Sequence, residues 1–341
     1  MTSDVDVLVV GGGPVGLAAA IEARLAGLSV ALVESRDGVI DKACGEGLMP
    51  GAIPLLNRLG VDPEGMPLRG VSYQDATRRA DHHFRSGVGR GVRRTELHAA
   101  LAARANELGV HRVHERVDAL HQDQDGVTAA GIRARYLLGS DGLHSTVRRL
   151  AQLDQPARGM RRYGLRRHYE VAPWTDLIEV HWTRHAEVYV TPVAPDTVGI
   201  AVLGPSHTSF DDALAVIPEL AGRLEAHAFA SDLRGAGPLQ QRARARHSGR
   251  VLLVGDAAGY VDAITGEGLR LGFEQARVAV AAVAADTPAR YEREWSRVTR
   301  DFRVLTTGLV RAANSPLRRG IVPAAAALPR LYGSVVERLA R

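Results

Sequence analysis

The sequence predicts an α/β fold in which a parallel sheet is assembled from separate parts of the chain, an antiparallel sheet is inserted, and helices complete the C-terminal end. Three observations support this class. The first 34 residues follow a strand–helix–strand pattern, two later apolar runs each end at a carboxylate, and residues 163–203 contain four strand-like segments separated by turns. Continuous apolar runs are typical of buried parallel strands, whereas short segments with turns between them favour antiparallel pairing.

The first strand–helix–strand unit spans residues 5–34: an apolar β-branched run, VDVLVV, then a segment with helical periodicity, then a second apolar run. Gly11, Gly13 and Gly16 form a GxGxxG pattern at the first turn. The first glycine permits the tight bend, the second lets the backbone approach a pyrophosphate, and the third lets helix and strand pack closely. The unit therefore has the form of a phosphate-binding turn.

A carboxylate and a proline complete this unit. Glu34 ends the second strand, 18 residues after Gly16, where a carboxylate can accept hydrogen bonds from both ribose hydroxyls of an adenosine. Pro14 suits the first helical turn, because the N–H that it lacks would be unpaired there. Together these features predict a bound adenine dinucleotide.

Two further strand-to-turn junctions follow along the chain. One apolar run ends just before Asp141 and Gly142, and another ends just before Gly255 and Asp256, ahead of a glycine-rich loop and a helix from about Glu267. An NAD-dependent dehydrogenase would use the N-terminal motif alone. The two additional junctions therefore favour a different dinucleotide.

With GxGxxG and its acid, a DG pair and a GD pair in this order across residues 6–275, the sequence resembles the p-hydroxybenzoate hydroxylase-like FAD superfamily. The resemblance implies a Rossmann-like FAD-binding domain built from discontinuous segments, an inserted antiparallel β-sheet substrate domain and C-terminal helices. We expect the FAD-binding domain at residues 1–70, 90–155 and 240–285, the substrate domain at residues 71–89 and 156–239, and the helices at residues 286–341.

The resemblance also implies roles for single residues. Asp256 is expected to bond the ribityl hydroxyls, and Gly266 and Gly268 to let backbone N–H groups approach the pyrimidine edge of the flavin. Asp141 and Gly142 are expected to serve the pyrophosphate and the pyridine nucleotide.

Arg94 is similar to a family arginine that lies against FAD, and Val117 falls where a strand often contacts the adenine. A surface charge at a helix N-terminus and an ordinary strand core residue are the alternatives for these two positions. The full set of expected cofactor-binding residues is Gly11, Gly13, Pro14, Val15, Gly16, Glu34, Cys44, Gly45, Gly47, Leu48, Arg94, Val117, Asp141, Gly142, Gly255, Asp256, Gly266, Gly268 and Leu269.

Three local motifs resemble the geranylgeranyl reductase branch of this superfamily, whose members saturate isoprenoid double bonds. These are CGEGL at residues 44–48, TGEGL at residues 265–269 and the strand pair at residues 187–203. Ala263 stands where the aromatic hydroxylases usually carry a proline, which weakens a hydroxylase interpretation. The sequence YVTP lacks the second aromatic residue that the reductases usually show, so the two classes stay close.

The favoured reaction is therefore NAD(P)H-dependent reduction of a carbon–carbon double bond in an apolar isoprenoid, polyketide or aromatic molecule. The alternative is a flavin-dependent monooxygenase that hydroxylates through a C4a-hydroperoxyflavin. A flavin-binding module without catalysis is a third reading. NADPH or NADH is expected to visit transiently, because no second GxGxxG occurs.

The chain contains a single cysteine, Cys44, and a single lysine, Lys42. One thiol without companions is a poor metal site, so no metal is expected. A lysine near a thiol could lower the thiol pKa, which makes Cys44 either a reactive group or a compact flavin contact, with the contact preferred. Tyr189 is a second candidate catalytic residue, as a substrate-facing acid or a wall of the site.

Charge and composition exclude other classes. The net charge is +5, but the arginines are spread along the chain without a nucleic-acid-binding motif, so no nucleic acid is expected. A lone cysteine, the lack of a leader and the lack of a membrane span favour a cytoplasmic protein. The C-terminal helices are expected to cap the FAD domain, or to contact a membrane surface peripherally. The sequence does not indicate an oligomeric state.

Overall fold

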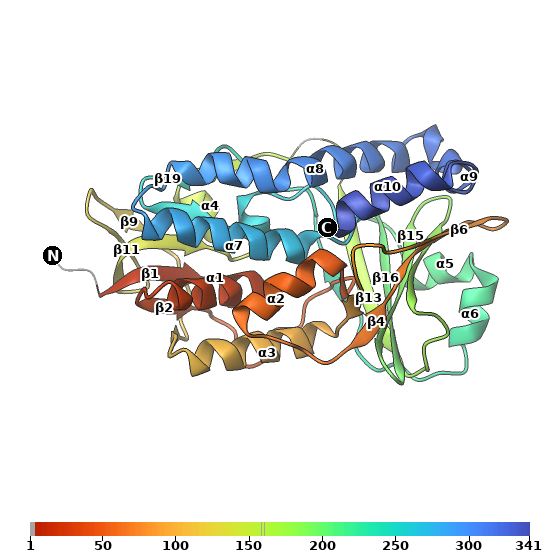
Figure 1. The fold of residues 1–341 in the computed structure, drawn as a ribbon, viewed down its shortest axis with the longest axis horizontal. Coiled ribbons are helices and arrows are strands. Elements are labelled where there is room, and N and C mark those ends of the chain that lie inside the picture. The colour runs from red at the N-terminus through yellow and green to blue at the C-terminus, as the bar shows by residue number, and fades with distance from the viewer. Residues whose placement is uncertain (1–3, 158, 160) are drawn as a thin grey trace.

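The computed structural model describes residues 4–157, 159 and 161–341. The first three residues of the expected FAD-binding domain, and residues 158 and 160 of the expected substrate domain, lie outside the described part. The chain forms two main sheets, one at each end of an elongated molecule, with helices along both (Figure 1).

An eight-stranded sheet forms around the N-terminal unit, in the order β19-β20-β11-β1-β2-β8, with the β9–β10 hairpin attached to β11. The pairs from β20 to β8 are all parallel, as expected from the apolar runs of β20, β11, β1 and β2, whereas β8 is a short polar strand at the edge. The strands are β1 (Val5–Val10), β2 (Val30–Val33), β8 (His111–Val113), β9 (His121–Gln122), β10 (Val127–Ala129), β11 (Ile132–Gly139), β19 (His247–Ser248) and β20 (Val251–Leu253).

Helices α1 (Pro14–Leu25), α3 (Arg94–Glu107) and α7 (Gly268–Ala284) accompany this sheet, with α1 packed against both of the others. Helix α1 begins at Pro14, as expected, because proline suits the first helical turn. The Rossmann-like arrangement predicted from the sequence is confirmed.

A seven-stranded sheet forms the other end of the molecule, in the order β17-β13-β16-β15-β14-β5-β6. The expected antiparallel pairing is found except between β14 and β5, which are parallel, so the sheet is mixed. The strands are β5 (Gly70–Gln74), β6 (Arg79–His83), β13 (Arg162–Tyr169), β14 (Leu177–Trp182), β15 (Glu187–Ala194), β16 (Thr197–Pro205) and β17 (Arg234–Ala236).

Antiparallel strands often alternate polar and apolar residues, but the centre of this sheet does not show that pattern of burial. Strands β15 and β16 are buried on both faces. One face packs against helices α5 (Phe210–Ala215) and α6 (Pro218–Leu224), which the sequence analysis did not identify. The other face turns toward the first sheet and the C-terminal helices.

The C-terminal helices divide between the two ends of the molecule. Helix α8 (Arg290–Ala313) lies along α7, whereas α9 (Ile321–Ala327) and α10 (Pro329–Ala340) cover β5 and β6 of the second sheet (Figure 1). The C-terminal helices were expected to cap the FAD-binding domain, but of these three helices only α8 packs along α7 of that part of the chain. Across the described residues, no helix combines the length and apolar character needed to cross a membrane.

Short elements connect these parts. They are β3 (Gly47–Leu48), β4 (Met66–Leu68) and β7 (Gly89–Gly91) in a three-stranded sheet, β12 (Asp154–Gln155) paired with β18 (Arg242–Ala243), η1 (Pro50–Ala52), α2 (Ile53–Leu59), α4 (Thr146–Leu150), η2 (Gly255–Ala258) and η3 (Pro316–Gly320).

Candidate functional site

A cavity of about 950 Å³ lies between the two main sheets. On one side it is lined by the residues that follow the carboxyl ends of β1, β2, β11 and β20, which is where open α/β sheets bind ligands. The opposite wall is apolar and comes from the second sheet and α10. Its side chains are Val71, Tyr73, Ile178, Val180, Tyr189, Ala201, Leu203, Val336 and Leu339.

The glycine loop after β1 is fixed by close backbone contacts. A Cβ on Gly11, whose φ is +105°, would lie 2.6 Å from the carbonyl oxygen of Ser140. A Cβ on Gly16 would lie 1.8 Å from the carbonyl oxygen of Gly11. Glycine is therefore required at both positions, and the start of α1 meets the cavity through its backbone, as the motif predicts.

Glu34 lies at the cavity edge, but its oxygens already have partners. Oε2 accepts a hydrogen bond from the Gly12 N–H at 2.8 Å, and Oε1 accepts from the N–H and Nε of Arg36 at 3.0 and 2.9 Å. Burial acts to raise the pKa of Glu34, but these hydrogen bonds outweigh it and hold the pKa below its usual value. An adenosine ribose would therefore compete with Arg36 for this carboxylate.

Asp141 lines the cavity and also caps a helix. Its carboxylate accepts hydrogen bonds from the Ser145 hydroxyl at 2.5 Å and from the N–H groups of Thr146 and Val147 at 2.6 and 3.1 Å, at the start of α4. The neighbouring Gly142 has a φ of +82°. Any dinucleotide contact of Asp141 is shared with this capping role.

Arg94 carries a buried charge beside the glycine loop. Its Nη1 has no hydrogen-bond partner among the described residues, and its Nη2 lies 3.8 Å from the position of a Cβ on Gly13. Burial lowers the pKa of Arg94, although a guanidinium stays charged at any pH of interest. A buried cation without a partner, next to the positive end of α1, matches a pyrophosphate, so the residues fit FAD.

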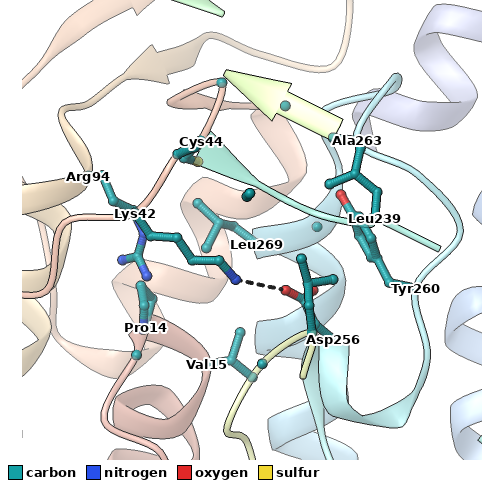
Figure 2. A pocket seen from close by; sticks show the side chains of 18 of the residues that line it. Pro14, Val15, Lys42, Cys44, Arg94, Leu239, Asp256, Tyr260, Ala263 and Leu269 are labelled. Atoms are coloured by element: carbon teal, nitrogen blue, oxygen red, sulfur yellow. Dashed lines mark ion pairs between the residues drawn. The ribbon is translucent and has the colours of Figure 1, made fainter. Parts of the chain in front are cut away.

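Lys42 reaches over the cavity toward the GD pair. Its Nζ lies 3.6 Å from Asp256 Oδ2, and also 3.6 Å from the position of a Cβ on Gly142 (Figure 2). In Figure 2 Lys42, Cys44 and Arg94 lie on one side, with Leu239, Tyr260 and Ala263 on the other. The Lys42 ammonium group therefore lies between the turn at Asp141 and Gly142 and the turn at Gly255 and Asp256.

Cys44 lines the cavity with a neutral thiol. Burial raises the pKa of Cys44, and Glu46 raises it further, while Arg94 and Arg166 act in the opposite direction. The Glu46 N–H donates a hydrogen bond to Sγ at 3.4 Å. The prediction that Lys42 lowers this pKa is wrong, because the Lys42 side chain is directed toward Asp256.

Tyr189 forms part of the cavity wall. Its hydroxyl donates a hydrogen bond to the carbonyl oxygen of Ile264 at 2.9 Å, which ties the second sheet to the loop before α7. Burial raises the pKa of Tyr189 well above its usual value. The geometry is that of a wall residue, one of the two roles expected for it, and the acid role stays a prediction.

Most of the residues predicted to bind the cofactor meet at this cavity. They are Gly11, Gly13, Pro14, Val15, Glu34, Cys44, Gly45, Gly47, Arg94, Val117, Asp141, Gly142, Asp256, Gly266, Gly268 and Leu269. Gly16, Leu48 and Gly255 do not line it. Gly16 packs helix against strand, Leu48 is buried in the core, and the N–H of Gly255 donates to Gln275 Oε1 at 2.8 Å.

The sequence analysis missed a buried polar network beneath Cys44. Glu46, Arg166 and His168 are each at most 3% exposed, and they join the CGEGL segment to β13. In β13 the alternation is inverted, because alternate residues from Arg162 to His168 form the buried face. The sequence signal that could have revealed this network is the pair Arg166 and His168, two positions apart in a strand and therefore on the same face.

The fold and the cavity are those of a dinucleotide-binding protein in which the parallel sheet faces a second, mixed sheet. A family model described as "FAD binding domain" matches residues 4–288, and the chain belongs to this family. The predicted resemblance to the p-hydroxybenzoate hydroxylase-like superfamily is confirmed.

Curated relatives carry different activities. The chain is 28% identical to a dialkyldecalin synthase of Streptomyces rugosporus, over 79% of this chain and 63% of that protein. It is 30% identical to the 12-dehydrotetracycline 5-monooxygenase/anhydrotetracycline 6-monooxygenase of Streptomyces rimosus subsp. rimosus, over 80% and 61%. It is 28% identical to the menaquinone reductase of Mycolicibacterium smegmatis, over 86% and 80%. The chain thus spans about three fifths of the first two relatives.

Solved structures agree on the fold. The p-nitrophenol 4-monooxygenase of Pseudomonas putida DLL-E4 matches with a TM-score of 0.81 at 20% identity, over 100% of this chain and 99% of that one. The anhydrotetracycline hydroxylase of Streptomyces rimosus matches with a TM-score of 0.72 at 26% identity, over 98% and 75%.

Proposed function

We propose that this protein is an FAD-dependent oxidoreductase that uses NAD(P)H to saturate a carbon–carbon double bond of an apolar small molecule. The observation that carries the proposal is the position of the Cys44 thiol, which lines the cavity between the predicted flavin-binding turns and the apolar wall. Burial raises the pKa of this thiol, which favours the S–H form.

Pro14, Arg94 and Asp256, which line the cavity, would hold FAD, and FAD bound there would supply hydride transfer from NAD(P)H to a substrate carbon. Saturation also requires a proton at the other carbon of the double bond, and a positioned acid supplies it. The Cys44 S–H bond breaks, its electron pair stays on sulfur, and the proton forms the second C–H bond. Arg94 and Arg166 stabilise the resulting thiolate, which regains a proton from water.

The remaining wall is suited to an apolar substrate. Ile178, Val180 and Leu203 from the second sheet, with Leu339 from α10, present no ionisable group to the cavity. Such a surface binds an isoprenoid or a fused-ring molecule through apolar contact and excludes water from the reacting carbons.

A second candidate is monooxygenation of an aromatic or polyketide molecule. The observation in its favour is the identity of about 30% to a tetracycline monooxygenase, slightly above that to the menaquinone reductase. The reductase, however, shares more of its own length with this chain, 80% against 61%.

One experiment separates the two reactions. FAD-loaded protein is given NADPH or NADH with menaquinone, digeranylgeranylglycerophospholipid or anhydrotetracycline, in air and under anaerobic conditions. We expect substrate-dependent NAD(P)H oxidation that persists without oxygen. Turnover that stops without oxygen would contradict the reductase, and no turnover with any probe would contradict both reactions.

We also propose peripheral contact of the C-terminal region with anionic membranes. Leu317, Leu328 and Leu331 are at least 53% exposed and lie close to arginines such as Arg319 and Arg330 in the chain. Basic residues beside apolar ones suit an anionic interface. Flotation with phosphatidylglycerol vesicles tests this, and equal recovery with neutral phosphatidylcholine vesicles would contradict it.

A further inference from the structure

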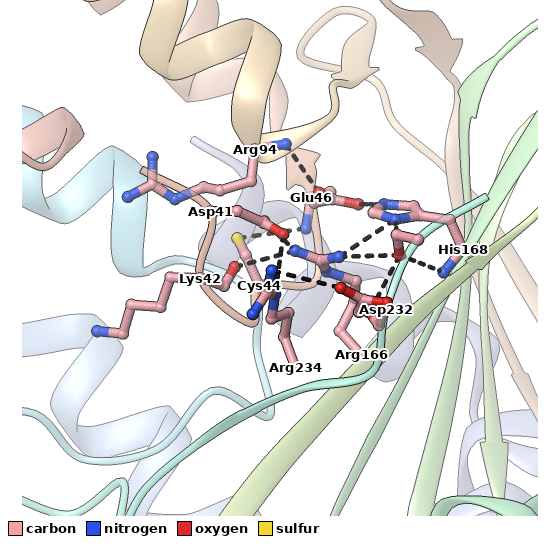
Figure 3. Close-up of polar contacts among 10 residues, drawn as sticks. Asp41, Lys42, Cys44, Glu46, Arg94, Arg166, His168, Asp232 and Arg234 are labelled. Atoms are coloured by element: carbon pink, nitrogen blue, oxygen red, sulfur yellow. Dashed lines mark hydrogen bonds and ion pairs between the residues drawn. The ribbon is translucent and has the colours of Figure 1, made fainter. Parts of the chain in front are cut away.

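The loop at residues 41–47, which carries Cys44, is attached to β13 at both ends (Figure 3). At one end Arg166 forms an ion pair with Asp41. At the other end Glu46 Oε2 lies 2.5 Å from His168 Nε2. The thiol therefore lies between two attachment points on a single strand.

The imidazole of His168 is held on both sides. Its Nδ1 lies 2.8 Å from Ser231 Oγ and 3.2 Å from Arg166 Nη1. Its Nε2 lies against the Glu46 carboxylate. Arg166 thus supports the bond that His168 makes to the loop.

Glu46 also ties the loop to the start of α3. Its Oε1 accepts a hydrogen bond from the Arg94 N–H at 2.7 Å, at the start of α3. The φ of Glu46 is +59°, a conformation that residues with a Cβ rarely adopt, so the surrounding contacts must enforce it.

The backbone beside the thiol is held from a second strand. Thr191 Oγ1, on β15, donates a hydrogen bond to the Gly45 carbonyl oxygen at 2.9 Å. With the Glu46 N–H on Sγ, the residues on the C-terminal side of Cys44 have fixed partners.

We propose that Glu46, His168 and Arg166 form a clamp that positions the Cys44 thiol against the cavity. They are positioning residues, because none of the three side chains donates the proton itself. This role deepens the proposed function and rests on it for its effect on turnover, but the position of the thiol can be measured without any substrate.

The test is alkylation of Cys44 by iodoacetamide in FAD-loaded protein, followed by mass spectrometry, since the chain has no other cysteine. In His168→Phe the Glu46 carboxylate loses its contact with β13 but keeps the Arg94 N–H, and we expect alkylation at least about tenfold faster than in the wild type. His168→Gln keeps an N–H for Glu46 and should return the rate toward that of the wild type.

A matched control exists at the opposite edge of the same sheet. His82 Nε2 lies 2.9 Å from Glu337 Oε1 in another buried pair, so His82→Phe removes a similar contact far from the loop. We expect its alkylation rate to equal that of the wild type. An unchanged rate in His168→Phe, or an equal acceleration in His82→Phe, would overturn the clamp.

If His168→Phe does not fold, Thr191→Val removes one loop contact without changing the side-chain shape. A rate increase of about threefold supports a held thiol, and no increase overturns it. Where the proposed function also holds, His168→Phe lowers kcat by about tenfold or more at unchanged KM, because a misplaced donor slows proton transfer. If His168→Phe speeds alkylation as expected but the wild-type protein reduces none of the three probes, the proposed function is refuted and the clamp is retained.

Discussion

Two loops enter the cavity from the first sheet, and they are held in different ways. The loop at residues 11–16 is fixed by its own backbone, because Gly11 and Gly16 lie where no Cβ fits. The loop at residues 41–47 is fixed by side chains of β13, whose His168 lies 122 positions after Glu46. An added methyl group should disrupt the first loop, whereas loss of a polar side chain of β13 should disrupt the second.

We relate this difference to the roles proposed for the two loops, pyrophosphate binding for the first and proton donation for the second. A pyrophosphate is bound by backbone N–H groups, so the first loop needs close approach and no side chain. Proton donation needs one side chain at one place, so the second loop needs long-range attachment. Arg94 joins the two, since its guanidinium lies near Gly13 and its N–H holds Glu46.

The largest expected effect is that of Gly16→Ala. The added Cβ would lie 1.8 Å from the Gly11 carbonyl oxygen, and backbone must move to relieve the contact. We expect a loss of more than about 3 kcal/mol in unfolding free energy, together with loss of bound FAD. Urea unfolding and the flavin content of the purified protein measure both.

A matched control for this variant is Gly222→Ala in α6, where an added Cβ meets nothing within 4 Å. It should stabilise the protein by about 0.5–1 kcal/mol. Equal unfolding free energies of the two variants would contradict the explanation that the first loop has no room for a Cβ at Gly16.

A third loop, before α7, differs from both because it buries the carboxylate of Glu267, which is 1% exposed. Burial raises the pKa of Glu267 to about 7, against the opposing effect of Arg270, and its Oε1 has no partner among the described residues. The folded state therefore holds this proton more tightly than the unfolded state does. Stability should fall by about 2 to 3 kcal/mol as the pH rises from about 4.5 to about 7.

Glu267→Gln cannot ionise, so its stability relative to the wild type should increase over the same pH range. Thermal unfolding of both proteins from pH 4.5 to 8 provides the measurement. Parallel curves would show that Glu267 does not contribute.

Arg94→Met separates the two functions of the residue that joins the loops. The variant keeps the backbone N–H to Glu46 but removes the buried guanidinium beside Gly13. We expect FAD affinity to fall by about 30-fold, near 2 kcal/mol, with the stability of the FAD-free protein nearly unchanged. Titration of FAD by fluorescence quenching tests it, and an unaltered Kd would remove Arg94 from the binding site.

The smallest effect concerns Lys42. Because it is the only lysine, an amine-directed acetylating reagent modifies this side chain and the N-terminal amine alone. FAD bound at Asp256 should cover Nζ, which lies 3.6 Å from that carboxylate, and slow its acetylation by about threefold to tenfold. Equal acetylation with and without FAD would place the cofactor away from Lys42.

The same contrast explains what the sequence predicts. Gly11, Gly16 and Asp256 are visible in short motifs because local geometry demands those residue types. The pairing of Glu46 with His168 depends on how β13 is placed against a distant loop, and no local pattern records it. The inverted burial of β13 and the pKa of Cys44 were missed for the same reason, since both arise from tertiary packing.

The central claim, that this protein adds hydrogen across a double bond, is tested most directly by the mass of its product. FAD-loaded protein is supplied with NADPH and menaquinone under ¹⁸O₂, and the product is analysed by mass spectrometry. We predict that the product, reoxidised to the quinone before analysis, carries two extra hydrogen atoms in its isoprenoid side chain by fragment mass and no ¹⁸O. A product that carries one ¹⁸O atom would contradict this account and identify a monooxygenase.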